Sequence, residues 1–324
     1  MSAIELAGVT KRYEDVTAVE ELDLTVEEGE IYGFLGPNGA GKSTTINVLL
    51  DFVRPTSGDV HVLGRDAQAE SVAIRRRTGV LPEGFSVYDR LTGREHVEFA
   101  IESKELDVEP DPILERVGLT DDADRKAGGY SKGMEQRLAL AMALVGQPQL
   151  LILDEPSSGL DPAGAKEMRE IVREEAERGA TVFFSSHVLG QVEAVCDRVG
   201  ILRDGHLVAE DSIEGLREAV GGEESLRITV DAASDDQLEA VRGLEGVSAA
   251  ATDGGTVSVT CESGAKTDVI STLEEQGVTV KDFQTEETSL EDLFLAYTEG
   301  AAPEDDTGAE SGEAAAAGST EVAE

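Results

Sequence analysis

The sequence predicts an α/β protein with a large unit built on a mostly parallel sheet and a smaller α+β unit behind it. Strand-like and helix-like segments alternate over the first two thirds of the chain, which favours a sheet with helices on both faces. A glycine-rich loop joins the buried strand EIYGFLG to the helix KSTTINVLLDF. After Val220-Gly221-Gly222 the pattern restarts as β-α-β-β-α-β, the order of a ferredoxin-like domain.

These patterns divide the chain into three parts. We expect a first domain over residues 2–220, a small α+β accessory domain over 223–300, and a tail over 301–324. The tail consists of small and acidic residues without aromatics, so it cannot bury enough apolar surface to fold and is predicted to be disordered.

The elements of the first domain follow from local patterns. The chain opens with two β-rich segments, AIELAGVT and TAVEELDLTV, which turn-like KRYED separates. Later segments predict, in order, a strand in RRRTGVLPEG, a helix in SKGMEQRLALAMALVG, a strand in QLLILDEP, a helix in AGAKEMREIVREEAERG, a strand in ATVFFSSH and a helix in VLGQVEAVCDRVGIL leading to a further strand. Ser131 is placed to cap its helix, and QLLILDEP is apolar on both faces, as a central parallel strand should be.

The charge balance excludes one class of partner and favours one environment. The chain has 67 acidic and 27 basic side chains and a formal net charge of -40. Nucleic acid binding requires a basic surface, so we expect no nucleic acid partner. The acidic side chains of such a chain repel one another unless salt screens the repulsion. We therefore expect the protein to work in the salt-rich cytoplasm of a halophile. An acidic protein without halophilic adaptation is the alternative.

Other features place the protein inside the cell. The two cysteines, Cys196 and Cys261, are far apart and form neither a disulfide framework nor a metal knuckle. The N-terminus MSAIELAGVT lacks the regions of a signal peptide, and the longest apolar run, residues 138–145, is shorter than the roughly 20 residues that cross a bilayer. We expect a soluble intracellular protein whose membrane role, if any, comes through a partner.

Residues 36–44 match the phosphate-binding pattern G-x-x-x-x-G-K-[ST]. Its glycines let backbone N–H groups point at a phosphate, and the following helix presents its positive end there. Lys42 is expected to bridge the β- and γ-phosphates of ATP, and the Ser43 hydroxyl to bind Mg²⁺. The alternative, a glycine-rich turn with a solvated lysine, is disfavoured because a strand precedes the loop and a helix follows it. The predicted nucleotide-binding residues of this loop are Gly36, Pro37, Asn38, Gly39, Ala40, Gly41, Lys42, Ser43 and Thr44.

Two carboxylates follow the buried strand 150–153. Asp154 at the carboxyl end of a parallel strand lies beside such a loop and is expected to hold Mg²⁺. Glu155 points elsewhere and can take a proton from the attacking water as general base. An ordinary Asp-Glu-Pro turn is the alternative.

Together with these motifs, Ser131-Lys132-Gly133-Met134 and Ser158-Gly159-Leu160-Asp161 resemble the signature motif and D-loop of the ABC transporter ATPases. The resemblance covers about residues 2–215. It implies a P-loop NTPase fold with a RecA-like core, a β-subdomain and a helical subdomain. It also implies head-to-tail pairing, in which Ser131, Gly133 and Asp161 of one copy approach ATP held by the other. A plain helix N-cap at Ser131 is compatible with that role.

The resemblance assigns three more residues. His187 matches the switch histidine that contacts the γ-phosphate and positions water, Tyr13 matches the aromatic that stacks on adenine, and Glu83 occupies the switch turn that offers a Mg²⁺ ligand. A structural histidine and a partly exposed turn tyrosine are the alternatives. The chain departs from the family pattern at Glu83, where Gln is usual, and at three signature positions, Tyr130, Lys132 and Met134.

The function implied is that of the ATP-hydrolysing subunit of a membrane exporter. The ending SLEDLFL resembles the C-terminal extension of ATP-binding subunits of the drug-export and sodium-export type. The expected partners are a transmembrane permease and a second copy of the chain or a related ATPase subunit, with the protein docked on the inner face of the cell membrane. The alternative is a soluble ATPase clamp of the same family acting in translation or DNA repair. A metabolic kinase would leave the signature and D-loop unexplained.

Overall fold

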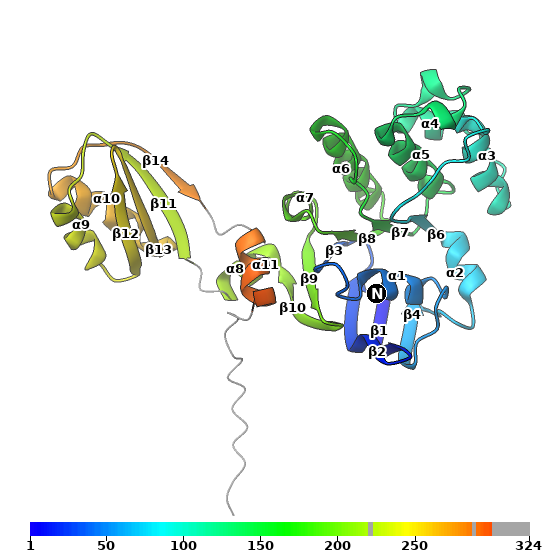
Figure 1. The fold of residues 1–324 in the computed structure, drawn as a ribbon, viewed down its shortest axis with the longest axis horizontal. Coiled ribbons are helices and arrows are strands. Elements are labelled where there is room, and N and C mark those ends of the chain that lie inside the picture. The colour runs from blue at the N-terminus through cyan, green and yellow to red at the C-terminus, as the bar shows by residue number, and fades with distance from the viewer. Residues whose placement is uncertain (220–222, 287–289, 300–324) are drawn as a thin grey trace, which may run out of the picture.

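Three β-sheets organise the computed structural model, which describes residues 1–219, 223–286 and 290–299 (Figure 1). The predicted disordered tail, 301–324, lies outside the described residues. No helix in the described ranges is both long and apolar enough to cross a membrane.

The first sheet is antiparallel and has the order β2-β1-β4-β5. Its strands are β1 (Ser2–Tyr13), β2 (Val16–Glu27), β4 (Ser57–Val62) and β5 (Arg65–Asp66). The second half of β2 alternates buried and exposed residues, because one face of this sheet packs on the core. The turn predicted over KRYED is longer than the turn in the structure, because Lys11, Arg12 and Tyr13 belong to β1. Tyr13 still pairs with Val16, and the left-handed backbone of Glu14 (φ 49°) lets a two-residue loop reverse the chain.

The central sheet is mostly parallel, as predicted, with the order β10-β9-β3-β8-β7-β6. Its strands are β3 (Ile31–Leu35), β6 (Thr78–Leu81), β7 (Leu150–Asp154), β8 (Thr181–Ser186), β9 (Arg198–Arg203) and β10 (His206–Ser212). Only the edge pair β9–β10 is antiparallel. Every residue of β3, β7 and β8 is buried, which fits a sheet covered on both faces.

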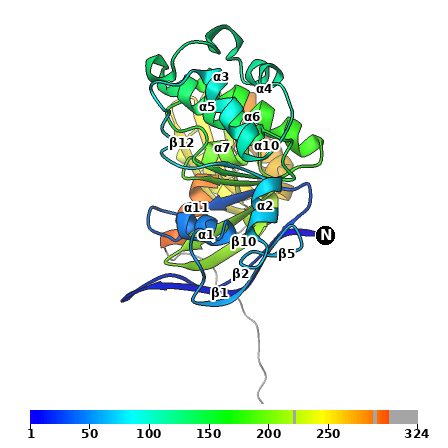
Figure 2. The same ribbon diagram turned by 90° about the vertical axis from the view of Figure 1, so that its right-hand side faces the viewer.

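Two cores flank this sheet because successive side chains of a strand point to opposite faces. In β7, Leu151 and Leu153 belong to the core shared with the helices, whereas Leu150 and Ile152 belong to the core shared with α1 and the first sheet. The helices that precede the third sheet are α1 (Lys42–Leu49), α2 (Ser71–Arg77), α3 (Gly93–Ser103), α4 (Asp111–Arg116), α5 (Lys132–Leu144), α6 (Pro162–Glu177), α7 (Leu189–Glu193) and α8 (Ile213–Ala219), with 3₁₀ turns at Thr120–Asp122 and Ala127–Gly129. Helices α3, α4 and α5 gather at the end away from the first sheet (Figure 2).

The third sheet forms a separate lobe with its own apolar core. Its order is β12-β13-β11-β14, with strands β11 (Glu223–Val230), β12 (Val247–Asp253), β13 (Thr256–Glu262) and β14 (Val280–Glu286), all antiparallel. The helices of the lobe are α9 (Asp235–Arg242) and α10 (Lys266–Glu275), the latter preceded by a 3₁₀ turn at Ser263–Ala265. The β-α-β-β-α-β element order is the predicted one. The last helix, α11 (Leu290–Glu299), packs not on this lobe but on α7, α8 and β9.

Candidate functional site

The glycine-rich loop lies between β3 and α1, at the carboxyl edge of the central sheet. Gly41 has a φ of 114°, and a Cβ there would lie 2.5 Å from the carbonyl oxygen of Ala18, so only glycine fits. The loop therefore curls tightly against the first sheet before α1 begins at Lys42. Free backbone N–H groups at this helix start are the donors that a phosphate group needs.

Lys42 lies inside the loop rather than in solvent. Its side chain is buried, and its ammonium group donates hydrogen bonds to the carbonyl oxygens of Gly36 (2.6 Å) and Pro37 (3.3 Å). Burial lowers the pKa of Lys42, and the nearby carboxylates of Glu155, Asp154 and Glu83 oppose that change. The cationic side chain of Lys42 thus lies near three carboxylates.

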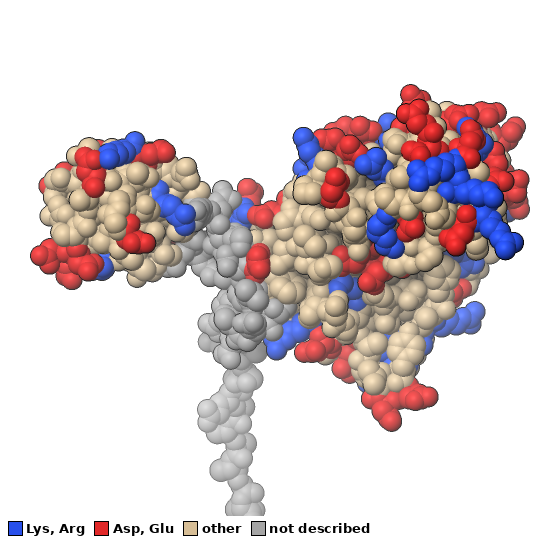
Figure 3. Space-filling model, turned by 45° about the horizontal axis from the view of Figure 1, so that its top comes forward, with Lys and Arg blue, Asp and Glu red and all other residues tan. Residues whose placement is uncertain are grey.

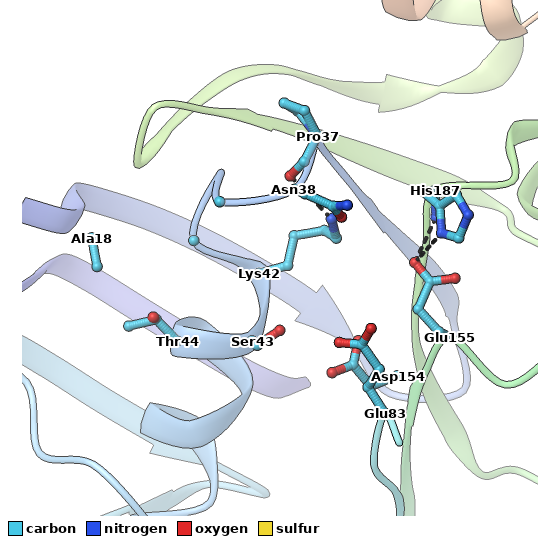
Figure 4. Close-up of a pocket in the computed structure, with 12 residues that line it drawn as sticks. Ala18, Pro37, Asn38, Lys42, Ser43, Thr44, Glu83, Asp154, Glu155 and His187 are labelled. Atoms are coloured by element: carbon cyan, nitrogen blue, oxygen red, sulfur yellow. Dashed lines mark hydrogen bonds and ion pairs between the residues drawn. The ribbon is translucent and has the colours of Figure 1, made fainter. Parts of the chain in front are cut away.

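Asp154 is the last residue of β7 and is 6% exposed. Its pKa is raised, first by burial and further by the negative charges of Glu83 and Glu155. Figure 4 shows the carboxyl groups of Asp154 and Glu83 next to each other, facing the hydroxyl of Ser43. Hard oxygen donors from three segments that are distant in sequence therefore converge here.

Glu155 is held by the strand next to its own. Its backbone N–H donates to the carbonyl oxygen of Ser185 (2.9 Å), and its backbone is left-handed, with φ 50°. Its carboxylate accepts hydrogen bonds from the backbone N–H of His187 (2.8 Å) and from the hydroxyl of Ser186 (3.3 Å), and the Nδ1 atom of His187 lies 2.7 Å from it. The imidazole is mostly exposed, while the carboxylate beneath it is buried.

These groups line one cavity of about 400 Å³ (Figure 4). Its lining comprises Ala18, Pro37, Asn38, Gly39, Gly41, Lys42, Ser43, Thr44, Glu83, Asp154, Glu155 and His187. Eleven of these twelve residues are among those singled out from the sequence, since only Ala18 is not. The phosphate-binding loop, the oxygen donors and the carboxylate of Glu155 thus line the same cavity.

Several predicted residues do not line the cavity. These are Tyr13, Gly36, Ala40, Ser131, Gly133 and Asp161. Tyr13 ends β1, is 42% exposed and has the ammonium of Lys11 4.8 Å from its ring centre. Ser131 caps α5 by accepting from the N–H of Met134 (3.3 Å), and Asp161 caps α6 by accepting from the N–H of Gly164 (2.8 Å).

Sequence reasoning missed two residues at the site. Ala18 lies on β2 and reaches the cavity only because β2 passes beside Gly41. Ser186 precedes His187 and supports the carboxylate of Glu155. Ser186 ends the buried strand β8, one residue after Ser185, which pairs with Asp154 of β7, and this position is a signal that could have identified it.

A phosphate-binding loop, an Asp-Glu pair and a histidine at the carboxyl edge of one parallel sheet define a P-loop nucleotide hydrolase. Comparison with known proteins identifies the family of P-loop hydrolases to which the chain belongs. Residues 19–158 match the ABC transporter family, and residues 212–298 match the C-terminal domain of DrrA1-3-like ATP-binding proteins. The chain belongs to the ABC transporter ATP-binding proteins, and it hydrolyses ATP to drive transport across a membrane.

Individual relatives support this membership. The chain is 33% identical to the daunorubicin resistance ATP-binding protein DrrA3 of Streptomyces coeruleorubidus, over 92% of this chain and 96% of that protein. It is 42% identical to the bacitracin transport ATP-binding protein BcrA of Bacillus licheniformis, over 66% and 71%. A bacterial ABC transporter cassette solved as a dimer is similar with a TM-score of 0.60 and 27% identity, over 65% and 98%.

Proposed function

We propose that this chain powers an exporter of antibiotic-like compounds by closing head-to-tail on a second copy, or on a related ATPase subunit, when ATP binds. The observation that carries the proposal is the division of the predicted site. The cavity holds the P-loop, Asp154, Glu155 and His187, whereas Ser131 and Gly133 do not line it. A second copy facing the first would bring its signature helix to the open side of the nucleotide.

Each residue has a proposed role in binding. Tyr13 stacks on adenine, the loop N–H groups and Lys42 hold the phosphates, and Thr44 lies beside them. Ser131 and Gly133 of the opposing copy approach the γ-phosphate with the free amides of α5, and Asp161 lines the same seam.

Magnesium fits the donor set that the cavity offers. Ser43, Asp154 and Glu83 present a hydroxyl and two carboxylates, the oxygen ligands that this ion prefers. Burial first, and then repulsion from Glu83 and Glu155, raise the pKa of Asp154, and a bound divalent cation would relieve that repulsion. In the described ranges, no three or more His, Cys, Asp and Glu side chains are arranged to hold a metal by themselves. The proposed site instead combines protein oxygens with the phosphates of ATP, whose developing charge the ion would neutralise.

Hydrolysis is assigned to Glu155 and His187. A water molecule attacks the γ-phosphorus, Glu155 accepts a proton from that water, and the bond from the γ-phosphorus to the bridging oxygen breaks to give ADP and phosphate. His187 keeps the carboxylate in place and contacts the γ-phosphate. Loss of the phosphate would then open the pair of copies.

The proposed permease contact lies beside the turn that carries Glu83. Tyr88 is 65% exposed while its ring stacks on His96 of α3, and Phe99, one turn further along α3, is 56% exposed. Exposed aromatic side chains are enriched at protein interfaces. We place the chain on the inner face of the cell membrane, bound through this surface. The names of the daunorubicin and bacitracin relatives support an antibiotic as cargo.

The domain boundaries predicted from the sequence are part of the proposal. An ATP-binding domain over 2–220 would be followed by an accessory domain over 223–300 and a tail over 301–324. We also propose that the protein works in a salt-rich cytoplasm.

A mixing experiment tests the shared site. Lys42→Ala removes the P-loop cation, and Ser131→Arg blocks the signature, so each variant alone should be inactive. In an equal mixture, half of the mixed pairs' sites combine an intact P-loop with an intact signature, and ATPase activity should reappear. If the mixture stays as inactive as its components, while each variant is folded, the site is not shared between copies.

A further inference from the structure

The short helix α7 connects His187 to the strand that leads into the P-loop. It begins at Leu189, two residues after His187. Val192 of α7 is fully buried, and a Cβ built on Gly33 of β3 would lie 2.7 Å from its Cγ1 atom. Because Gly33 has no side chain, α7 lies directly against β3, and a shift of the helix would shift the backbone of His187.

A side-chain hydrogen bond joins α7 to the segment that follows Glu155. The hydroxyl of Ser157 donates to the Oε1 atom of Gln191. Ser157 is buried and lies two residues after Glu155. Helix α7 therefore contacts both sides of the hydrolytic pair, through the chain to His187 and through Gln191 to the Glu155 segment.

The last helix of the described chain supports α7 from behind. Leu290 and Leu293 of α11 are fully buried, in the same core as Val192 of α7 and Leu216 of α8. α11 packs on α7, α8 and β9, and Arg217 of α8 forms an ion pair with Glu193 of α7. None of the described residues of α8 or α11 lines the nucleotide cavity, so both act one layer behind it.

α8 and α11 are also the two helices between which the third-sheet lobe lies in the chain (Figure 1). The lobe has its own core, which shares no residue with the core around α7. The chain therefore enters the lobe after α8 and returns from it at α11, and both helices contact α7.

We infer that Leu290 and Leu293 of α11 are positioning residues for ATP hydrolysis, which act through Gln191 and α7 to fix His187 against Glu155. This inference rests on the proposed roles of Glu155 and His187. Loosening α11 affects the proton-accepting pair and leaves the P-loop intact. The hydrolytic rate should fall while nucleotide affinity stays the same. The lobe thereby gains a route to set the turnover rate without touching ATP.

The test uses the full-length chain and compares two leucine truncations. Leu293→Ala should lower kcat about ten- to a hundredfold, the range that a misplacement of about 1 Å produces. Its Kd for a non-hydrolysable ATP analogue should stay within about twofold of the parent, which also verifies that the ATPase part is folded. Leu293→Met preserves volume and should restore most of the rate. Leu273→Ala in α10 removes the same atoms from the separate core of the lobe and should leave kcat within about twofold.

A second variant avoids the apolar core. Gln191→Ala should produce a similar loss of kcat with unchanged analogue affinity. Combined with Leu293→Ala it should cost no more than the larger single effect, because both act through α7. Independent, multiplying effects, or equal effects of Leu293→Ala and Leu273→Ala, would overturn the inference. Glu155→Gln is measured in parallel. If it stops turnover and Leu293→Ala does not, only this inference is lost, whereas parent-like turnover in Glu155→Gln rejects the proposed chemistry itself.

Discussion

The Nδ1 atom of His187 lies 2.7 Å from the Oε1 atom of Glu155, and the backbone N–H of His187 donates to that same oxygen at 2.8 Å. One residue thus holds the proposed base at two points. The remaining carboxylate oxygen accepts from Ser186. These contacts orient the carboxylate of Glu155 before any nucleotide binds.

Glu155→Gln should lower ATP hydrolysis about 10²- to 10⁴-fold, the usual contribution of a general base. The amide keeps the shape of the side chain and can still accept from the N–H of His187, so ATP binding should persist. Steady-state kcat and an ATP titration measure the two effects separately. Turnover at the parent rate would remove Glu155 from the role of base.

Lys42→Ala should abolish tight nucleotide binding, because the buried ammonium is the cation provided by the P-loop itself. Lys166→Ala is the matched control, since that lysine is 71% exposed on α6 and pairs only loosely with Glu170 (3.8 Å). Calorimetric titration with ATP should show loss of binding in the first variant alone. Equal affinities in both variants would contradict the P-loop assignment.

Glu83→Gln should change how magnesium-dependent ATP binding responds to pH. The pKa of Asp154 is raised, so Asp154 takes up a proton at a higher pH than an ordinary aspartate. Its raised folded-state pKa means that proton uptake stabilises the fold at low pH, and this stabilisation is lost as pH rises through that pKa. Metal binding depends on pH in the opposite direction from this contribution to folding stability, because it requires the ionised carboxylate of Asp154 and weakens as pH falls.

Removing the charge of Glu83 should lower the pKa of Asp154, so that metal-dependent binding persists to lower pH. At neutral pH the variant should need more magnesium, because it has lost an anionic ligand. The half-saturating magnesium concentration, measured across pH, reports both effects. Glu28→Gln removes an exposed carboxylate elsewhere and serves as control. Superimposable profiles for the parent and Glu83→Gln would show that Glu83 does not act on this site.

The fold should lose stability at low salt. Figure 3 shows acidic side chains in several clusters on both lobes, and 67 acidic residues oppose 27 basic ones in the whole chain. Salt screens their repulsion over about 10 Å at 0.1 M and over about 3 Å at 1 M. The melting temperature followed by circular dichroism should therefore rise with potassium chloride. Sorbitol at equal osmolarity, which screens no charge, should not reproduce the rise at low salt. A melting temperature independent of salt would end the halophile proposal.

The sequence was most informative where function depends on neighbouring residues. The loop around Lys42, the Asp154-Glu155 pair and His187 each follow a buried strand, and parallel strands bring their carboxyl ends together, so their convergence was predictable. The capping role of Ser131 was also confirmed, since a cap depends on the next few residues alone.

Contacts between distant segments were not predictable. Ala18 reaches the cavity through the path of β2, and the hydrogen bond from Ser157 to Gln191 joins the turn after β7 to helix α7. The predicted helix over VLGQVEAVCDRVGIL ends already at Glu193, since the chain must enter β9 at Arg198 to pair with β3. The return of α11 to α7 has no local signal, because its apolar stripe would serve equally well against the lobe that precedes it.

The left-handed backbone of Glu155 (φ 50°) is strained, although the residue is needed as the proposed base. For a residue with a Cβ this conformation costs about 1–2 kcal/mol, and glycine escapes the penalty. Glycine would remove this strain, but it would also remove the carboxylate that accepts hydrogen bonds from His187 and Ser186, so the contacts of Glu155 offset the strain of its backbone. Backbone preference and catalysis therefore ask for different residues at this position, and a redesign guided by backbone conformation alone would place glycine here and discard the base.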